Sequence, residues 1–448
     1  MSAPASRTER LLTAPIVPTL ARFAAPGIVL VAFQTAVSIG DTHFVGRLGT
    51  EPLAGLALVF PLVMLLQMTS AGAMGGGVSS SIARALGGGR HDAARRLAVH
   101  AVVLAAALGI AFTVLMLAGD QAIYRLLGGK GTALAEALAY SNVLFGGATL
   151  VWFANTFASI LRGSGNMLVP AVALSAAATV HVPLTAALVL GLGPFPRLGI
   201  AGAGVAYVVD FALASAVMLA WLLRPASRLR PTRGDLRFEP ELFREILRVG
   251  ALSIVSSLQT VLTAVILTGL VARFGSAALA GYGVGVRLEL LQVPLVFAIG
   301  QAMVALVGTS IGAGRAERAK RIAFIGSALA AGICLVIGLA VAIVPEAWIG
   351  IFSDDPAVRA TGATYLRTVG PFYPFLGLGI ALYFASQGAG QVLLPVLAGT
   401  VRLGLVVIGG AAAVALGASV GWLFAVVAAA MLVFGALTAW FVARARWG

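Results

Sequence analysis

Long apolar segments recur along the whole chain, and short polar segments separate them. At about 1.5 Å per residue, a helix of roughly 20 residues crosses a bilayer core of about 30 Å. Twelve segments are long and apolar enough to span a membrane, at about residues 23–46, 53–83, 97–118, 138–161, 169–193, 199–223, 247–272, 278–311, 322–344, 364–386, 394–416 and 419–443. The pattern predicts an all-α integral membrane protein with twelve transmembrane helices.

The two halves of the chain repeat each other at an offset of 225 or 226 residues. Three of the repeated blocks are VGRLGTEPLAG (45–55) with VARFGSAALAG (271–281), LGGGRHDAARR (86–96) with IGAGRAERAKR (311–321), and RGSGNMLVP (162–170) with QGAGQVLLP (387–395). We therefore expect a six-helix bundle over residues 1–223, a cytoplasmic linker over 224–246, and a second, pseudo-symmetric bundle over 247–448. Parallel repeats of this kind are typical of transporters, which place their substrate between the repeats.

Composition and charge agree with a membrane protein and exclude a nucleic-acid partner. The mean hydropathy is +1.01, and only 10% of the residues are charged. The net charge is +14, but the arginines gather in short loops between the apolar segments. If the N-terminus is cytoplasmic, 21 of the 30 Lys and Arg residues lie on that side, as the positive-inside rule requires. We expect both termini in the cytoplasm and, because Cys334 is the single cysteine, no disulfide and no cysteine-based metal site.

Three acidic residues lie within the predicted spans, and these are the main candidates for chemistry: Asp41, Asp210 and Glu289. An acid in the bilayer core costs about 2.5–3.5 kcal/mol and usually faces a polar cavity or an ion path. Asp41 is the strongest candidate, although it could instead lie at a helix end, solvated beside His43 and Arg47. Asp210 could equally be an acid at a helix interface. The repeat partners of these two are Leu267 and Gly435, so an acidic pair exists in the N-terminal half alone.

Other polar side chains in the same half can complete a binding site for a proton, a small cation or a cationic substrate: Gln34, Asn155, His181 and Thr185. A spacing of four residues places His181 and Thr185 on one helix face. Burial and a second carboxylate both disfavour the charged form of an acid, so one of the acids is expected to bind a proton near neutral pH. Pro26 either bends the first span as a hinge or is an ordinary first-turn proline.

The C-terminal half offers a different polar set. Glu289 follows Arg287 by two residues and has Gln292 nearby, which predicts an internal ion pair or hydrogen-bonded cluster. Arg402 lies in the middle of a span without a local acid, so it needs a partner or water, and Glu289 is a candidate partner.

Enzyme chemistry is not expected. The chain has no G-x-S-x-G, P-loop or H-E-x-x-H motif and no cluster of histidines and acids at metal-ligand spacing. The glycine runs at 75–77 and 87–89 fit close helix packing and a tight turn better than a phosphate site. We therefore expect no cofactor, no bound metal apart from Na⁺ as an alternative at Asp41, and no ATP hydrolysis.

Several motifs together resemble the MATE (multidrug and toxic-compound extrusion) family, over essentially all of residues 20–443. They are DTHFVGRLG from Asp41 with PLAG, the turn GGGRHDAARR with its copy GAGRAERAKR, the pair NTFASILRGSGNMLVP (from Asn155) and YFASQGAGQVLLP (from Tyr383), and VRLELL from Val286. The RxE of Arg287 and Glu289 resembles the DinF-like branch. The resemblance implies a V-shaped pair of six-helix bundles that exports organic cations in exchange for protons or sodium.

The same resemblance implies roles for single residues. Asp41 and Asn155 match the family's first-span Asp and fourth-span Asn, and Pro26 matches the proline that bends on proton binding. The chain departs from the pattern in the fifth span, where relatives often have Asn and Asp and this chain has His181 and Thr185. Asp210 is then a candidate replacement for the missing acid. The C-half sodium site of other branches has no counterpart, since Gln259 and the tenth span supply no carboxylate.

The expected function is a secondary antiporter in the bacterial cytoplasmic membrane that works as a monomer and exports organic cations and drugs in exchange for protons. Proton coupling is preferred to sodium because His181 can titrate and few carboxylates are fixed at the site. A sodium-coupled exporter stays open, because the site also offers hard oxygen ligands. So does a flippase for a lipid-linked or amphipathic metabolite, although only Arg287 and Arg402 supply the basic cavity that it needs. A channel fits poorly, because channels conduct through a continuous polar pore.

Overall fold

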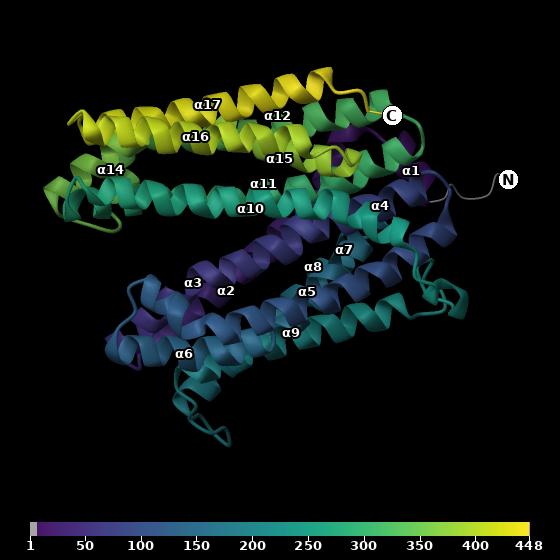
Figure 1. Ribbon diagram of the computed structural model, residues 1–448, viewed down its shortest axis with the longest axis horizontal. Coiled ribbons are helices and arrows are strands. Elements are labelled where there is room, and N and C mark those ends of the chain that lie inside the picture. Colours follow the sequence, from purple (N-terminus) through teal and green to yellow (C-terminus); the bar gives the residue numbers. More distant parts are fainter. Residues whose placement is uncertain (1–6, 448) are drawn as a thin grey trace. The chain divides into compact units, whose positions relative to one another are not determined.

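The structure is a computed structural model that describes residues 7–447, with the backbone alone at positions 7, 8, 10 and 233. The first six residues of the predicted cytoplasmic N-terminus lie outside the described part. The first half contains helices α1 (Arg7–Thr13), α2 (Ile16–Gly46), α3 (Thr50–Gln67), η1 (Met68–Met74), α4 (Gly75–Gly87), α5 (His91–Leu126), α6 (Gly131–Gly146), α7 (Ala148–Gly163), α8 (Leu168–Leu190) and α9 (Ile200–Leu222), as Figure 1 shows.

The second half follows a similar order after the short 3₁₀ helix η2 (Arg233–Leu236). Its elements are α10 (Pro240–Ala272), α11 (Ser276–Gly312), α12 (Ala316–Ile343), α13 (Pro345–Ile349), α14 (Pro356–Val369), η3 (Gly370–Phe372), α15 (Tyr373–Ala389), α16 (Leu393–Ala415) and α17 (Val420–Arg444). Between residues 7 and 447 the chain forms no strand.

Eleven helical segments of the described chain are long and apolar enough to cross a membrane, and α6 with α7 forms a twelfth if the bent pair is one span. The prediction of an all-α integral membrane protein with twelve spans is confirmed. The α6–α7 pair bends by 48° at Gly147. A Cβ atom at Gly147 would lie 2.4 Å from Val208, so α9 packs against the bend where no side chain fits.

The chain divides into two compact units whose limits differ from the predicted halves. One unit is Ala25–Ala251, here called the N unit. The other, here called the C unit, is Leu252–Gly448 together with the segment that ends at Ala24. Two helices, α2 and α10, therefore run from one unit into the other.

The N unit is a bundle in which α8 packs on α9, α5 on α7, and α3 on α6. Small residues let the backbones of these helices approach closely, as is common in membrane bundles. At Gly202 of α9 an added Cβ would lie 2.7 Å from the backbone of Leu188, and at Gly109 of α5 it would lie 2.8 Å from Thr149. This tight packing fixes the positions of polar side chains that point inward.

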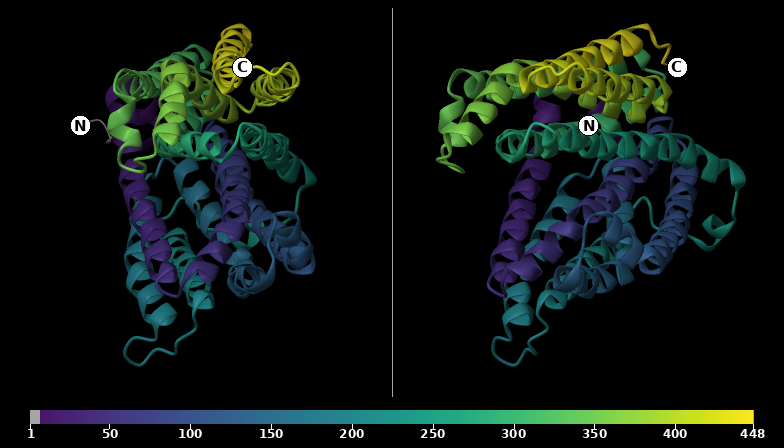
Figure 2. Two further views of the ribbon diagram at one scale, coloured as in Figure 1. Left: turned by 90° about the vertical axis from the view of Figure 1, so that its left-hand side faces the viewer. Right: turned by 60° about the vertical axis from the view of Figure 1, so that its left-hand side comes forward.

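The C unit has α11, α12 and α17 packed around α15, and the α16–α17 pair runs side by side in every view (Figures 1 and 2). Its core contains fully buried aromatic rings, among them Tyr365, Tyr373 and Phe424. The backbones of α12 and η3 come very close, because a Cβ at Gly338 would lie 2.1 Å from the carbonyl oxygen of Gly370. Backbone on both sides leaves this contact no room to relax.

Replacing Gly338 with alanine is expected to destabilise the protein by about 1–3 kcal/mol, because the new methyl group overpacks a backbone contact. Gly332→Ala in the same helix is the matched control, since no atom lies within 4 Å of its added Cβ. Thermal unfolding of the two variants in detergent measures the effect. A melting temperature for Gly338→Ala equal to that of Gly332→Ala would contradict the close approach.

Candidate functional site

Asp41 lies near the end of α2 and is buried, with 8% of its surface exposed. Its Oδ1 lies 2.9 Å from Nε2 of His181, which is 1% exposed on α8. Asp41 is therefore not a solvated helix-end acid. The alternative in which it lies beside His43 and Arg47 without an internal partner is excluded by this hydrogen bond.

The second acid of the N unit approaches the other side of the same imidazole ring. Asp210 on α9 places Oδ2 3.7 Å from His181 Nδ1, which is too long for a direct hydrogen bond but close for two charged groups. Its side chain is 12% exposed. The imidazole thus lies between two carboxylates from two other helices, an arrangement in which a protonated ring is stabilised from both sides.

Asp41, His181 and Asp210 are here called the triad. Two buried oxygens at this site have no hydrogen-bond partner: Oδ1 of Asp210 itself and Oγ1 of Thr185. Thr185 is fully buried one helical turn after His181, as its spacing predicted. Buried polar atoms are normally paired, so these two oxygens are available to a proton, a water molecule or a bound cation. No group of three or more His, Cys, Asp or Glu side chains in the described chain has the geometry of a metal site.

A second polar network lies next to the triad and contains Asn155. Asn155 Nδ2 donates to Ser70 Oγ at 2.8 Å and to Gln67 Oε1 at 3.1 Å, and Gln67 Nε2 donates to the hydroxyl of Tyr207 at 2.7 Å. The ring of Tyr207 makes an edge contact with His181, with centroids 6.5 Å apart. One chain of contacts therefore runs from Asp41 to Asn155.

The network centres on the point where the second span changes its helical form. Gln67 ends α3, and the seven residues Met68–Met74 form the π-helix η1 before α4 begins. π-Helical turns in α-helices are rare and occur frequently at functional sites. Here the π-helix carries Ser70, fully buried, directly against Asn155.

The structure brings together most, but not all, of the predicted N-half residues. Asp41, His181 and Asp210 meet directly, Thr185 lies on the same helix face, and Asn155 is linked through Tyr207. Gln34 is exposed on α2 and has no hydrogen bond to the others in the described structure. Pro26 lies inside the continuous helix α2, two residues after the unit boundary at Ala24; its role as a hinge stays a prediction.

The C-half polar residues have some of the partners that were expected and some that were not. Glu289 accepts a hydrogen bond from the hydroxyl of Tyr365. Arg287 is exposed and stacks on Phe352, with its guanidinium 5.1 Å from the ring centroid. Arg402 lies 5.5 Å from the ring centroid of Phe434. Of the two expected arrangements, the described structure has the hydrogen bond of Glu289 and not an Arg287–Glu289 ion pair. Arg402 interacts electrostatically with Glu289, as expected, but makes no direct ion pair with it.

Glu289→Gln is expected to leave transport and its dependence on the pH gradient nearly unchanged, because Tyr365 can donate to an amide oxygen as well. Tyr365→Phe removes the donor and is expected to cost about 1–3 kcal/mol of stability. Melting temperature and transport are measured for both variants. If Glu289→Gln abolished transport, Glu289 would belong to the functional site and not to the core of the C unit.

Comparison with known proteins gives the family. The MatE family model matches residues 26–187 and again residues 252–412. Among curated proteins, an FAD transporter of Shewanella oneidensis is 26% identical over 376 residues, covering 84% of this chain and 82% of the relative. The probable multidrug resistance protein NorM of Thermotoga maritima is also 26% identical, over 379 residues and 84% and 81% of the two chains.

The fold is shared with solved structures. A MOP superfamily transporter from Pyrococcus furiosus superposes with a TM-score of 0.91 at 23% identity, over 98% of both chains. The two matches to the family model cover most of the chain and fall on its two repeats, in agreement with the sequence repeat, the twelve spans and the buried acids of the N unit. This protein therefore belongs to the MatE family of membrane transporters.

Proposed function

We propose that this protein is a secondary antiporter of the bacterial cytoplasmic membrane that exports organic cations in exchange for protons. The observation that carries the proposal is the buried imidazole of His181 between Asp41 and Asp210. A titratable base between two acids, removed from bulk water, is a group that can take up and release protons during transport.

The charges of the triad account for exchange. With both carboxylates ionised and the imidazole neutral, the triad carries two net negative charges. A proton taken up by the imidazole lowers this charge by one, and so does one bound monovalent organic cation. Because a charge in a low-dielectric site needs a partner, the proton and the cation compete for the same negative charge. Binding one from each side of the membrane in turn gives exchange.

The relatives support an organic cation as the exported substrate. The Thermotoga relative is named as a probable multidrug resistance protein, and a relative from Staphylococcus saprophyticus is the multidrug export protein MepA, 22% identical over 387 residues. A site with two acids and one histidine attracts cations. Assignment to the DinF-like branch, the hinge at Pro26 and a monomeric state belong to this proposal as well.

Sodium is the second candidate for the coupling ion. The unpaired oxygens of Thr185 and Asp210 are the hard ligands that a small cation prefers. However, Asp41 Oδ1 is already hydrogen-bonded to His181, so one of the oxygen ligands that a small cation would need is occupied. This pairing favours the proton. A flippase of an amphipathic metabolite is the remaining alternative. The relative named as an FAD transporter suggests what such a substrate could be. However, two buried carboxylates repel the phosphate groups of a substrate of this kind.

Transport into proteoliposomes tests the proposal. Uptake of a fluorescent organic cation is measured under an imposed pH gradient and, separately, under an imposed sodium gradient. We expect the pH gradient alone to drive uptake. If only the sodium gradient drove uptake, the protein would still be a cation exporter, but sodium and not the proton would be its coupling ion. If neither gradient drove cation uptake and the protein transported FAD instead, the proposal of a cation exporter would be wrong.

A further inference from the structure

The chain crosses between its two units twice, and both crossings lie inside continuous helices. Helix α2 begins at Ile16 in the C unit and continues past Ala24 into the N unit. Helix α10 begins at Pro240 in the N unit and continues past Ala251 into the C unit. The first helix of each half thus begins in the unit that belongs to the other half. We call these beginnings, together with the segments that come directly before them, the lead-ins: residues 11–24 and residues 229–251.

The first lead-in is bound by the turn between α11 and α12. Arg318 Nη2 donates to the carbonyl oxygens of Leu11 at 3.1 Å and Ala14 at 2.5 Å, and Arg315 Nη1 donates to that of Leu12 at 2.9 Å. Cations at the carbonyl end of a helix complement its dipole. Leu11, Leu20 and Ala24 are buried in the hydrophobic core of the C unit, so this lead-in is part of that core.

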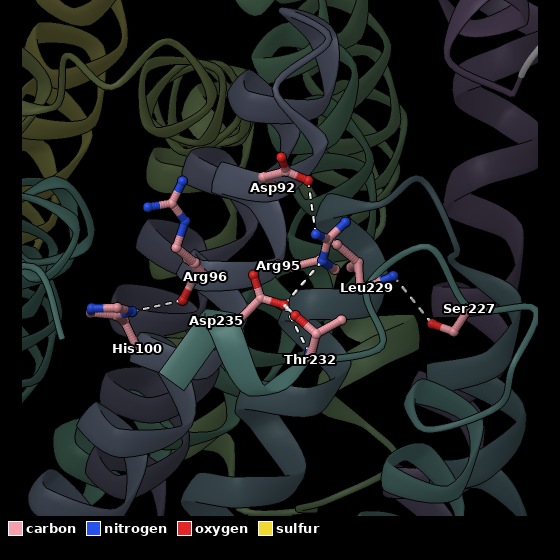
Figure 3. A network of polar contacts seen from close by, with 8 residues as sticks. All are labelled: Asp92, Arg95, Arg96, His100, Ser227, Leu229, Thr232 and Asp235. Atoms are coloured by element: carbon pink, nitrogen blue, oxygen red, sulfur yellow. Dashed lines mark hydrogen bonds and ion pairs between the residues drawn. The ribbon is translucent and has the colours of Figure 1, made fainter. Parts of the chain in front are cut away.

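The second lead-in is bound by the first turns of α5, in the matching block of the N unit (Figure 3). Arg95 Nε pairs with Asp235 Oδ2 at 3.1 Å, and Arg96 pairs with Glu239. Burial alone would raise the pKa of Asp235, but hydrogen bonds from Thr232 and Arg95 outweigh it and lower the pKa below its usual value. Asp235 therefore stays ionised, and its pairing persists, at any pH near neutrality.

The start of α10 is fixed further by a histidine and by close packing. His100, fully buried on α5, accepts the backbone N–H of Glu239 at 2.9 Å, and its Nδ1 lies 2.7 Å from the carbonyl oxygen of Arg96. Nearly two turns into α10, a Cβ at Gly77 would lie 2.7 Å from the carbonyl oxygen of Ile246. Ile246 and Val249 are almost completely buried.

The two lead-ins are related by the internal repeat. Both binding turns come from the repeated block, GGGRHDAARR at 87–96 and GAGRAERAKR at 312–321. The binding arginines occupy different positions of the block, since Arg318 aligns with Ala93 and Arg95 with Lys320. In both halves, therefore, the first span begins in the unit of the other half, although different residues bind it. This indicates that the fold requires the exchange itself and not a particular set of contacts.

We propose that each unit carries a binding surface for the lead-in of the other half's first span, and that both lead-ins stay bound throughout transport. Burial of apolar side chains makes release costly on both sides. Any motion of one unit against the other must then be absorbed within α2 and α10 themselves, beyond Ala24 and beyond Ala251. This inference requires that the protein transports a solute, as proposed above, but not that the coupling ion is a proton.

Reversible cross-linking tests whether the lead-ins stay bound. In a Cys334→Ser background, cysteine pairs replace Arg96 and Glu239, or Leu12 and Arg315, and a short bis-thiosulfonate reagent joins each pair. Uptake is measured before cross-linking, after it, and after reduction, under whichever gradient drives the parent protein. We expect cross-linking to leave uptake unchanged or to raise it. A loss of uptake that reduction restores would mean that a lead-in must detach, and the inference would be wrong.

Hydrogen–deuterium exchange of the full chain gives a second readout that needs no transport. We expect the backbone amides of residues 16–24 and 241–250 to exchange slowly. Their exchange rates should be the same with and without a bound cation. Arg318→Gln should accelerate exchange around residues 11–20, whereas Arg321→Gln should not, because Arg321 has no recorded partner in the described chain. If binding of the cation accelerated the amide exchange of a lead-in, the inference would be wrong. This outcome can be read even if the transport assay fails.

Discussion

Asp41→Asn is expected to abolish uptake driven by a pH gradient. An asparagine cannot bind or release a proton, and it leaves His181 facing an amide where it now faces a carboxylate oxygen at 2.9 Å. Loss of a charge-assisted hydrogen bond of this kind costs about 1.5–3 kcal/mol of stability, and the variant also lacks the negative charge that a proton or a cation would pair with. Uptake by the variant in proteoliposomes should therefore fall to the rate of empty vesicles.

Asp354→Asn is the matched control, because the side chain of Asp354 is 99% exposed in a loop of the C unit. It should transport like the wild type. Monodisperse elution of both variants at wild-type yield excludes a folding defect. Normal pH-driven uptake by Asp41→Asn would show that this residue is structural, and Asp210→Asn would then be the next variant to test.

His181→Asn is expected to move the pH dependence of cation binding rather than to abolish binding. The imidazole is the most basic group of the triad, and two neighbouring carboxylates stabilise its protonated form. Without it, the first proton must bind to a carboxylate, so protons should displace the cation only at lower pH. We expect the midpoint of this competition to fall by about one pH unit or more.

The measurement is equilibrium binding of a fluorescent cation at several pH values, with and without sodium. The amide oxygen of asparagine is also a hard ligand, so the variant should respond to sodium more strongly than the wild type does. His91→Asn is the control, since His91 is exposed at the start of α5. An unchanged midpoint in His181→Asn would remove the imidazole from the coupling mechanism.

The hydrophobic pattern predicted the spans well because crossing a bilayer requires long apolar runs, and such runs are local in the sequence. It did not reveal the bend at Gly147, because hydropathy is the same on both sides of it. The bend depends on the contact of Gly147 with Val208, which lies 61 positions further along the chain. A hydropathy average over about 20 residues cannot detect a contact between residues so far apart in the sequence.

The candidate site was predicted in part for a similar reason. Asp41, His181 and Asp210 are unusual in apolar segments, and this rarity marked them as candidates, in addition to the family resemblance at Asp41. Gln67, Ser70 and Tyr207 were missed, since single residues of these types are common in membrane helices. Only their partners, 85 to 140 positions away, make them part of a network, and the one local signal was the position of Gln67 just before the small-residue stretch 69–77.

The ion pair of Arg287 with Glu289, one of the two arrangements expected there, does not form for a geometric reason. Residues two apart on a helix do not face each other, so one of the two side chains reaches Tyr365 and the other reaches Phe352. The spacing of four between His181 and Thr185 was a sound basis for prediction, because residues four apart share a helix face.

The exchanged lead-ins also set an order of events during synthesis. The segment that ends at Ala24 leaves the ribosome well before the arginines that bind it, Arg315 and Arg318, which follow roughly 300 residues later. At about 5–20 residues per second, the first helix waits roughly 15–60 s for its binding surface. The N unit, in contrast, can close as soon as residue 251 has been made. The beginning of the chain is therefore expected to be among the last parts to reach its native contacts.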